Sequence, residues 1–486
     1  MKFYFLPVLL LLSFQFFAQS PCKEMVGYYP NWQWYDRAAL VNPMTIDYSK
    51  YTVLNYSFFA PQTDGSLLST DTWADENLLL GPMNWQLNEH DFSLSLPYQC
   101  EVNDVKLLAS LGGWTLSTNF PGIASDPAKR AHFADHCTNL ITDFSFDGID
   151  IDWEYPANQT EKENFTLLLS EIRDSLDVLS ISTGEEYLVT AAFSASSVSM
   201  QNIDWNAVTE ILDFINLMSY DFFGTWDPIC NHNSPLFAPI QGDPSFNCAA
   251  AVTTLTNVHG VDPSKINLGI PFYGRSFKTT SAPDLFAPVQ GNSADNITFA
   301  ADEGTPLYYN IVLNENLFES HWDNNAQVPY LNGINGLQTF VSYDDTLSVA
   351  LKAQYILDQN LRGAIVWEIT GDYIETSPGS GIVASTPLAD KVNEVFCIGG
   401  GITIQGCTNA IATNYNPLAT EDDGSCIVSG CRYPQALNYN PEATIDDLSC
   451  VFECDTTCQS DLDHSGEVGV SDLIIFIGDF GTVCPE

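Results

Sequence analysis

Eight short apolar segments rich in β-forming residues recur between residues 24 and 369, and stretches with helical periodicity separate them. The segments are MVGYY (25–29), YTVLNYSFFA (51–60), VKLLASLGGW (105–114), FDGIDIDW (146–153), YLVTAAFSA (187–195), FINLMSY (214–220), INLGIPFYG (266–274) and GAIVWEI (363–369). The helical pattern is clearest over 126–144 and 163–179. Strand followed by helix, repeated eight times, predicts parallel strands closed into an α/β fold, the (β/α)8 barrel. An open doubly wound sheet is the alternative, and eight strands within residues 22–395 favour the barrel.

The connection between the last two predicted strands is much longer than one loop and one helix need. It includes SHWDNNAQVPYLN (320–332) and TFVSYDD (339–345), which have the composition of further strands. We therefore expect a small inserted α+β subdomain at about residues 276–343, beside the mouth of the barrel.

The composition changes after Val395. Residues 398–405 are Gly-rich and are predicted to form a linker. Residues 406–426 and 430–450 are two repeats with a period of 24 residues, and 13 of their 21 aligned positions are identical. Each repeat begins and ends with Cys, so the simplest pairing is Cys407–Cys426 and Cys431–Cys450, although four cysteines allow three connectivities. We place the repeats in a unit at 406–453 and the last segment at 454–486.

Residues 1–18 consist of one Lys, an apolar run and a terminal Ala, which predicts a secretory signal peptide. The 13 cysteines fit an oxidising compartment, and their odd number leaves at least one thiol unpaired or paired between chains. No later segment has the uninterrupted apolar length of a membrane span. The sequence therefore predicts a secreted protein.

The chain is strongly acidic, with 61 acidic and 16 basic residues and a net charge of −45 over 486 residues. Such a surface repels phosphate backbones and anionic lipids, which argues against a nucleic-acid or membrane partner. A neutral, cationic or polymeric ligand is compatible with this charge.

The motif FDGIDIDWEYP (146–156) carries the clearest chemical signal. Alternate residues of a strand share a face, so Asp150, Asp152 and Glu154 point the same way at the end of the strand where barrel active sites form. The apolar residues between them, Ile149, Ile151 and Trp153, face the helices. Neighbouring carboxyls raise one another's pKa, which creates an acid near neutral pH. Glu154 is outermost and is the candidate general acid.

A metal site and a solvated acidic face are the alternatives to catalysis for this motif. Hard cations bind oxygen ligands, but clustered His is missing and the spacing differs from that of a calcium loop. A solvated acidic face does not fit, because the alternating residues are bulky and apolar. Catalysis is the favoured interpretation.

DGIDIDWEYP resembles the DxxDxDxE signature of glycoside hydrolase family 18 chitinases. LASLGGW (108–114) resembles the SxGG strand of that family, and MSYDFFGTW (218–226), INLGIPFYGRSF (266–277) and GAIVWEITGD (363–372) resemble its strands six, seven and eight. The resemblance covers about residues 22–395 in the correct order. It implies an enzyme that hydrolyses β-1,4 bonds between N-acetylglucosamine units of chitin and that needs no cofactor for catalysis.

The resemblance also implies a substrate-assisted retaining mechanism. Glu154 would protonate the glycosidic oxygen, while the substrate's own acetamido carbonyl attacks C1 and forms an oxazolinium ion. Asp152 would bind the acetamido N–H and share a proton with Asp150. Tyr220 would bind the acetamido oxygen, and Asp221 would lie against Glu154 or the distorted sugar.

Aromatic side chains stack on the apolar faces of sugar rings. By the same resemblance, Trp367 would form the floor of the subsite for the cleaved sugar. The other candidate substrate-binding residues are Trp114, Trp226, Tyr28, Tyr273, Arg275, Met218 and Ser110.

Two alternative functions remain open from the sequence. One is a chitinase-like lectin that binds chitin without turnover, but such relatives typically lose the acid, and Glu154 is present. The other is an endo-β-N-acetylglucosaminidase acting on N-glycans, whose members generally lack the inserted subdomain. A chitinase is the favoured prediction.

The segment DLDHSGEVGVSD (461–472) is close to the EF-hand template. The candidate Ca²⁺ ligands are Asp461, Asp463, Ser465, Glu467 (through its carbonyl) and Asp472, with Gly466 at the sixth position. An acidic turn without metal is the alternative. The segment also resembles half of a dockerin, which normally has two such loops, so plain calcium binding is favoured over a cohesin-like or cell-surface partner.

Overall fold

The computed structural model describes residues 22–398, 405–415, 419, 421–452 and 460–480. The chain divides into two compact units, 1–400 and 401–486. The predicted signal peptide (1–18), most of the predicted linker (398–405), and Cys454, Cys458 and Cys484 lie outside the described residues. None of the described helices has the length and apolarity needed to cross a membrane.

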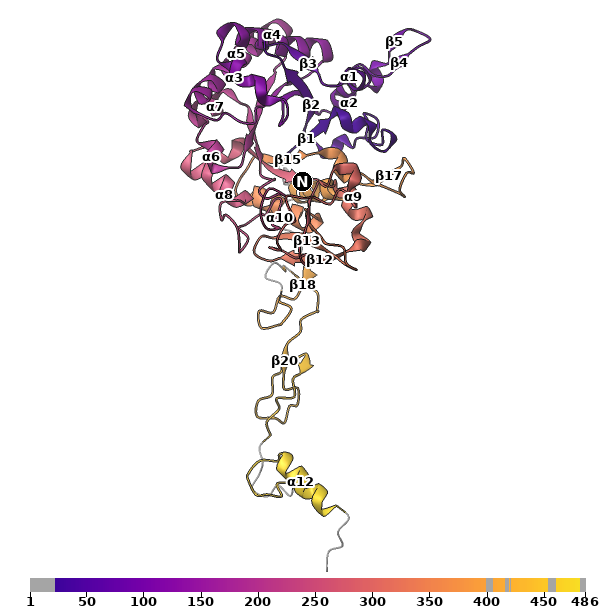
Figure 1. Cartoon of the computed structure of the whole chain (residues 1–486), viewed down its shortest axis with the longest axis vertical. Coiled ribbons are helices and arrows are strands. Elements are labelled where there is room, and N and C mark those ends of the chain that lie inside the picture. Colours follow the sequence, from indigo (N-terminus) through magenta and orange to yellow (C-terminus); the bar gives the residue numbers. More distant parts are fainter. Residues whose placement is uncertain (1–21, 399–404, 416–418, 420, 453–459, 481–486) are drawn as a thin grey trace, which may run out of the picture. The chain divides into compact units, whose positions relative to one another are not determined.

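The first unit is built around a closed sheet of eight parallel strands (Figure 1). The strands are β1 (Glu24–Pro30), β2 (Val53–Pro61), β6 (Lys106–Gly112), β7 (Gly148–Asp152), β8 (Leu188–Ser194), β9 (Phe214–Met218), β10 (Ile266–Pro271) and β15 (Gly363–Trp367). The sheet closes because β1 pairs with both β2 and β15. The (β/α)8 barrel is therefore confirmed, and the open sheet is excluded.

Helices surround this barrel (Figure 1). They are α1 (Thr72–Leu79), α2 (Leu96–Val102), α3 (Phe120–Ala124), α4 (Pro127–Phe144), α5 (Gln159–Thr183), α6 (Ser197–Met200), α7 (Trp205–Ile211), α8 (Cys248–Thr253), α10 (Thr346–Asp358) and α11 (Pro387–Ile398). The two longest begin at side-chain caps, Asp126 for α4 and Asn158 for α5. Both predicted helices are confirmed.

The first connection differs from the predicted strand–helix repeat. Between β1 and β2 the chain forms only 3₁₀ segments, at Asn31–Ala38 and Tyr48–Lys50. Arg37, Ala38 and Ala39 all adopt positive φ, which interrupts any helix there. The expectation of eight regular strand–helix units is thus wrong at this one connection.

The predicted insertion forms a second, antiparallel sheet between β10 and β15. Its strand order is β11 (Arg275–Lys278), β14 (Thr339–Ser342), β13 (Val328–Gly333) and β12 (Phe318–Asp323), and helix α9 (Tyr308–Leu313) belongs to the same segment. A small core of Phe299, Ile311, Phe318, Leu331 and Val341 stabilises it. The short remaining strands of the unit are β3 (Leu67–Ser69), β4 (Met83–Asn84), β5 (Glu89–His90), β16 (Ile374–Glu375) and β17 (Val383–Ser385).

A disulfide between Cys22 and Cys397 joins the beginning and the end of the barrel unit. The sequence did not indicate this pair, because the two cysteines are 375 residues apart. The other cysteines of the barrel, Cys100, Cys137, Cys230 and Cys248, are free and buried. Burial raises the pKa of each of these four thiols, so they are not reactive thiolates.

In the second unit, disulfides join Cys407 to Cys426 and Cys431 to Cys450, which confirms the simplest predicted pairing. Each repeat also contains one pair of very short parallel strands, β18 (Gln405–Gly406) with β19 (Glu421–Asp422) and β20 (Ser429–Gly430) with β21 (Ile445–Asp446). Helix α12 (Val470–Asp479) begins within the acidic segment 461–472 and continues beyond it.

Candidate active site

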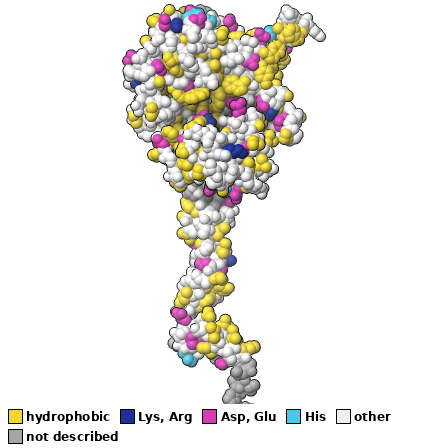
Figure 2. Space-filling model, viewed as in Figure 1, with side chains coloured by type: hydrophobic (Ala, Val, Ile, Leu, Met, Phe, Trp, Pro, Cys, Tyr) yellow, Lys and Arg dark blue, Asp and Glu magenta, His cyan; other side chains and the backbone are white. Residues whose placement is uncertain are grey.

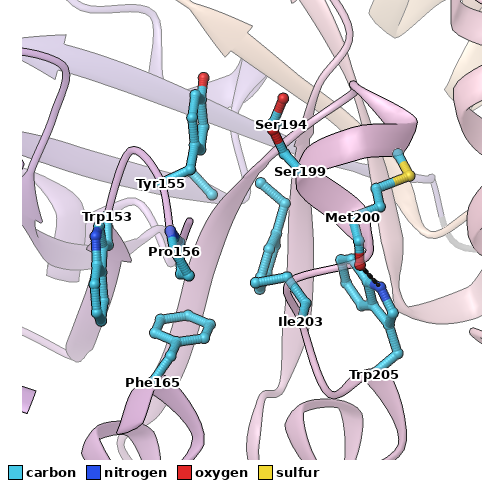
Figure 3. A pocket seen from close by; sticks show the side chains of 11 residues that line it. Trp153, Tyr155, Pro156, Phe165, Ser194, Ser199, Met200, Ile203 and Trp205 are labelled. Carbon is cyan, nitrogen blue, oxygen red and sulfur yellow. Dashed lines mark hydrogen bonds between the residues drawn. The ribbon is translucent and has the colours of Figure 1, made fainter. Parts of the chain in front are cut away.

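Strand β7 carries Asp150 and Asp152 to one end of the barrel, and Glu154 follows two residues after the strand ends. Asp150 and Asp152 are buried inside the barrel, with 0% and 4% exposure. The intervening Trp153 points to the helices, where it stacks on Phe120 of α3 and meets Phe165 of α5 edge-on. Figure 3 shows Trp153 and Tyr155 pointing in opposite directions from the chain, on one side of a small apolar pocket. The alternation predicted from the sequence is therefore present through Trp153 and ends at Tyr155, which points away from Trp153 although the two are two positions apart.

Asp150 is held by four donors, two on each carboxyl oxygen. Oδ2 accepts from Tyr28 Oη at 2.8 Å and from Ser110 Oγ at 2.8 Å. Oδ1 accepts from Thr190 Oγ1 at 2.6 Å and from Asn216 Nδ2 at 3.2 Å. Burial raises the pKa of Asp150, and these hydrogen bonds oppose the rise. Asp150 is thus a fixed anchor beneath the other two carboxyls.

Asp152 has a different environment. Its Oδ1 is buried and has no hydrogen-bond partner in the protein. Burial, followed by the charges of Glu154 and Asp150, raises the pKa of Asp152 well above its ordinary value. No direct hydrogen bond between the Asp150 and Asp152 carboxyls is found within the described residues. Asp152 is therefore the carboxyl that holds a proton and that is available to bind a ligand.

Glu154 is half-buried at the mouth of the barrel. Burial raises its pKa to about 7; the charge of Asp221 acts in the same direction, and a hydrogen bond from Tyr155 opposes it. Near neutral pH the group exists in both protonation states. This is the property that a general acid–base group needs.

The backbone around Glu154 is fixed by the end of β6. Gly113 N–H donates to Asp152 O at 2.8 Å, and Ser117 Oγ donates to the same oxygen at 3.1 Å and accepts from Glu154 N–H at 2.9 Å. Gly112 has a φ of 113°, and a Cβ there would lie 2.2 Å from Asp152 O. A glycine is required at this position because the two strands approach so closely.

Tyr220 and Asp221 follow β9 on the opposite side of the site. Asp221 Oδ1 accepts from Tyr273 Oη and from Arg275 Nε, each at 2.7 Å. Tyr220 packs edge-on against Tyr273, with ring centroids 6.0 Å apart. Burial raises the pKa of Tyr220 well above its ordinary value, so its hydroxyl stays neutral and can donate a hydrogen bond.

Aromatic rings surround these groups. Trp367 ends β15 and lies against Phe58 (5.7 Å between centroids), Tyr28 (5.5 Å) and Trp32 (6.4 Å). Trp114 and Trp226 are 75% and 53% exposed, beyond the ends of β6 and β9. The Arg275 guanidinium lies 4.7 Å over the Trp226 ring. Figure 2 shows hydrophobic side chains gathered in a hollow of the first unit.

Two predicted substrate-binding residues, Ser110 and Tyr28, are buried and donate hydrogen bonds to Asp150. Ser110 is fully buried, and its hydroxyl donates to Asp150; the expected direct ligand contact of Ser110 is therefore wrong. Tyr28 is 2% exposed, and its hydroxyl also donates to Asp150. Met218 is half-buried at the end of β9 and packs on the barrel core.

Sequence reasoning missed several contributors to the site. Thr190 and Asn216 donate to Asp150, and Trp32 and Phe58 pack on Trp367. Polar residues inside two otherwise apolar strands were the signal for the first pair. The aromatic run NWQWY after β1 was the signal for Trp32.

In the second unit, oxygens of Asp461, Asp463 and Asp472 lie within 4.8 Å of one another. Asp472 lies in the first turn of α12, and its carboxylate accepts the N–H groups of Leu462, Asp463 and Gly469. Ser465 Oγ donates to the carbonyl of Glu467 at 3.1 Å. All five predicted ligands thus belong to one compact turn.

Comparison with known proteins gives consistent results. A family model described as "Glycosyl hydrolases family 18" matches residues 24–372. Chitinase A1 of Niallia circulans is 32% identical over 435 residues, which cover 77% of this chain and 61% of that protein. The chain thus spans less than two thirds of that relative's length.

Solved structures agree with the family match. Chitinase ChiA74 from Bacillus thuringiensis has a TM-score of 0.68 and 30% identity, covering 81% of this chain and 74% of that one. A mutant of the second catalytic domain of the Ostrinia furnacalis group II chitinase, solved in complex with (NAG)5, has a TM-score of 0.66 and 27% identity, covering 78% and 97%.

Proposed function

Because this chain belongs to family 18 of the glycosyl hydrolases, we propose that it is a secreted chitinase, which cleaves β-1,4 bonds between N-acetylglucosamine units with retention of configuration. The observation that carries the proposal is the pairing of two neighbouring carboxyls with different tasks. Glu154 titrates near neutral pH at the mouth of the barrel, and Asp152 has a buried oxygen without a protein partner.

The two carboxyls divide the reaction between them. Glu154 donates its proton to the glycosidic oxygen while the acetamido carbonyl of the same sugar attacks C1, so the bond to the leaving group breaks as the oxazolinium ring closes. Glu154 then removes a proton from the incoming water, which opens the ring at C1. As the substrate binds, Asp152 gives its proton to Asp150, whose pKa burial also raises, and then accepts the acetamido N–H through Oδ1, so that its negative charge stabilises the cationic intermediate.

The surrounding residues hold these groups in place. Asp150 and Asp152 share one proton, which the four donors around Asp150 keep on Asp152 until the substrate binds and which Asp150 then takes up. Tyr220 donates its hydroxyl to the acetamido oxygen. Asp221 lies opposite Glu154, and its charge keeps the acid protonated.

The aromatic residues define the sugar-binding path. Trp367, supported by Phe58 and Trp32, forms the floor for the cleaved sugar. Exposed Trp114 and Trp226 provide stacking surfaces beyond it, and Arg275 and Tyr273 offer polar contacts next to Asp221.

The activity should depend on pH through Glu154. Its pKa is raised to about 7, so the protonated acid predominates below that pH and is lost above it. The titratable groups that face Glu154 are Asp152, Tyr155, Tyr220 and Asp221. We expect kcat/KM on short acetylated oligomers to fall as pH rises through about 7, measured in buffers of constant ionic strength. An alkaline limb near pH 4.5, the ordinary value for Glu, would contradict this environment for the acid.

We also propose that the turn 461–472 binds one Ca²⁺. Oxygens that share one calcium ion at 2.3–2.6 Å lie at most about 5 Å apart, and the carboxylate oxygens of Asp461, Asp463 and Asp472 meet this condition. Ser465 and the carbonyl of Glu467 complete an oxygen-only set. Calorimetry on the full chain should give about one site with Kd of roughly 10⁻⁴–10⁻³ M, abolished by Asp461→Ala. Equal calcium heats for the two proteins would contradict the site.

A further inference from the structure

The backbone of Asp221 is in the left-handed conformation, which few non-glycine residues adopt. Its φ is 58°, in the left-handed region, directly after Tyr220. A non-glycine residue stays there only when its surroundings impose it. The residue that fixes this turn therefore decides where the Asp221 carboxylate points.

Asn233 accepts hydrogen bonds from the backbone of this turn. Asp221 N–H donates to Asn233 Oδ1 at 3.0 Å, and the next amide, Phe222 N–H, donates to Asn233 O at 3.1 Å. The Asn233 Nδ2 atom lies 3.5 Å from Tyr273 O. Asn233 is 1% exposed, so its side of these bonds is shielded from water. One buried residue thus holds two consecutive amides of the catalytic turn and contacts the residue that binds the Asp221 carboxylate.

The inserted subdomain in turn fixes Asn233. Asn233 N–H donates to Ser342 Oγ of β14 at 2.7 Å. The preceding residue, His232, is fully buried and pairs through Nε2 with Asp323 Oδ2 of β12 at 3.0 Å. Both strands belong to the antiparallel sheet of the insertion.

The following residue links the same segment to the barrel. Ser234 Oγ donates to the carbonyl of Ser219 at 2.6 Å, just before Tyr220. It accepts from Lys352 Nζ at 2.7 Å, and Lys352 forms a fully buried ion pair with Asp344. Residues 231–234 are therefore a buried polar bridge between the insertion and the catalytic turn.

The conformation of the turn at Asp221 affects the electrostatic environment of Glu154. Tyr273 and Arg275 bind the Asp221 carboxylate, and the charge of that carboxylate raises the pKa of Glu154. A backbone change at Asp221 would move its charge relative to these three residues. Such a change would alter the protonation of Glu154 and the geometry of the reaction more than the affinity for the sugar chain.

We propose that Asn233 is a positioning residue that holds Asp221 in its left-handed conformation opposite Glu154, and that the inserted subdomain supports catalysis by fixing Asn233 through Ser342. This inference rests on the proposed chitinase function. It assigns to the insertion a role in the chemistry in addition to any role in shaping the cleft.

Asn233→Ala tests the proposal, and Asn247→Ala is the matched control. Asn247 is also buried, at 3% exposure, and its Oδ1 accepts a backbone N–H at 2.9 Å, but it caps α8 and contacts none of the proposed catalytic residues. Both variants lose one amide acceptor and should lose similar thermal stability. Only Asn233→Ala should lower kcat, by roughly 10–100-fold, with KM changed by less than about threefold. Its alkaline limb should also move to lower pH, because the Asp221 charge acts less on Glu154.

A second variant covers the case in which Asn233→Ala fails to fold. Ser342→Ala removes only a hydroxyl and should cause a smaller kcat loss, with the same direction of pH shift. If the folded variants show wild-type kcat and pH profile with only a lower Tm, the positioning role is wrong. If the wild-type protein itself does not hydrolyse acetylated oligomers, the proposed function fails first, and the two failures are thus distinguished.

Discussion

Replacing Glu154 with Gln is expected to reduce hydrolysis of acetylated chitin oligomers by roughly 10²–10⁴-fold, the contribution of general acid–base catalysis. The amide cannot donate the proton that the leaving oxygen needs, but it has the shape of the protonated acid. The fold should therefore persist, with an unchanged Tm and retained oligomer binding. The measurement is kcat and KM on a defined soluble oligomer.

Glu368→Gln is the control for this variant. Glu368 is another buried glutamate whose pKa burial raises to about 7, but its oxygens accept from Thr370 N–H and Oγ1 instead of facing the cleft. It should retain activity within about threefold. Unchanged turnover in purified Glu154→Gln, or equal losses in both variants, would contradict the assignment of Glu154 as the acid.

Removing the acetyl groups from the substrate is expected to have a second large effect. Glucosamine oligomers lack the carbonyl that attacks C1, and losing an oriented internal nucleophile costs at least about 10²-fold in rate. Electrostatic exclusion would not explain such a loss, because a chain of net charge −45 attracts protonated amines. The measurement compares initial rates on acetylated and deacetylated oligomers of equal length. Similar rates would show that the reaction does not use the acetamido group.

The fold was predictable because its determinants are local. Each barrel strand is a short apolar run bounded by polar residues, and the repeated strand–helix order leaves few topologies. The placement of Asp150, Asp152 and Glu154 followed from the two-residue period of a strand. The 3₁₀ connection after β1 was not predictable, because three consecutive left-handed residues without glycine leave no local signature.

The rest of the site depends on contacts between distant segments. Thr190 and Asn216 reach Asp150 from β8 and β9, and Asn233 reaches Asp221 from a loop whose sequence shows no helix or strand pattern. The Cys22–Cys397 bond likewise depends on where the barrel closes. Such partners become identifiable only when the strands are arranged in space. For the same reason, the sequence predicted a substrate contact for Ser110, whose hydroxyl instead donates to Asp150.

The central claim is that this chain cleaves chitin through the acetamido group of its own substrate. Its most direct test is proton NMR of the first products released from defined N-acetylglucosamine oligomers, recorded before mutarotation. The acetamido carbonyl attacks C1 from one face and water then opens the ring from the other, so the account predicts cleavage in which the β-anomer of the new reducing end appears first. Initial release of the α-anomer would contradict the mechanism, and binding without any release would instead identify a lectin.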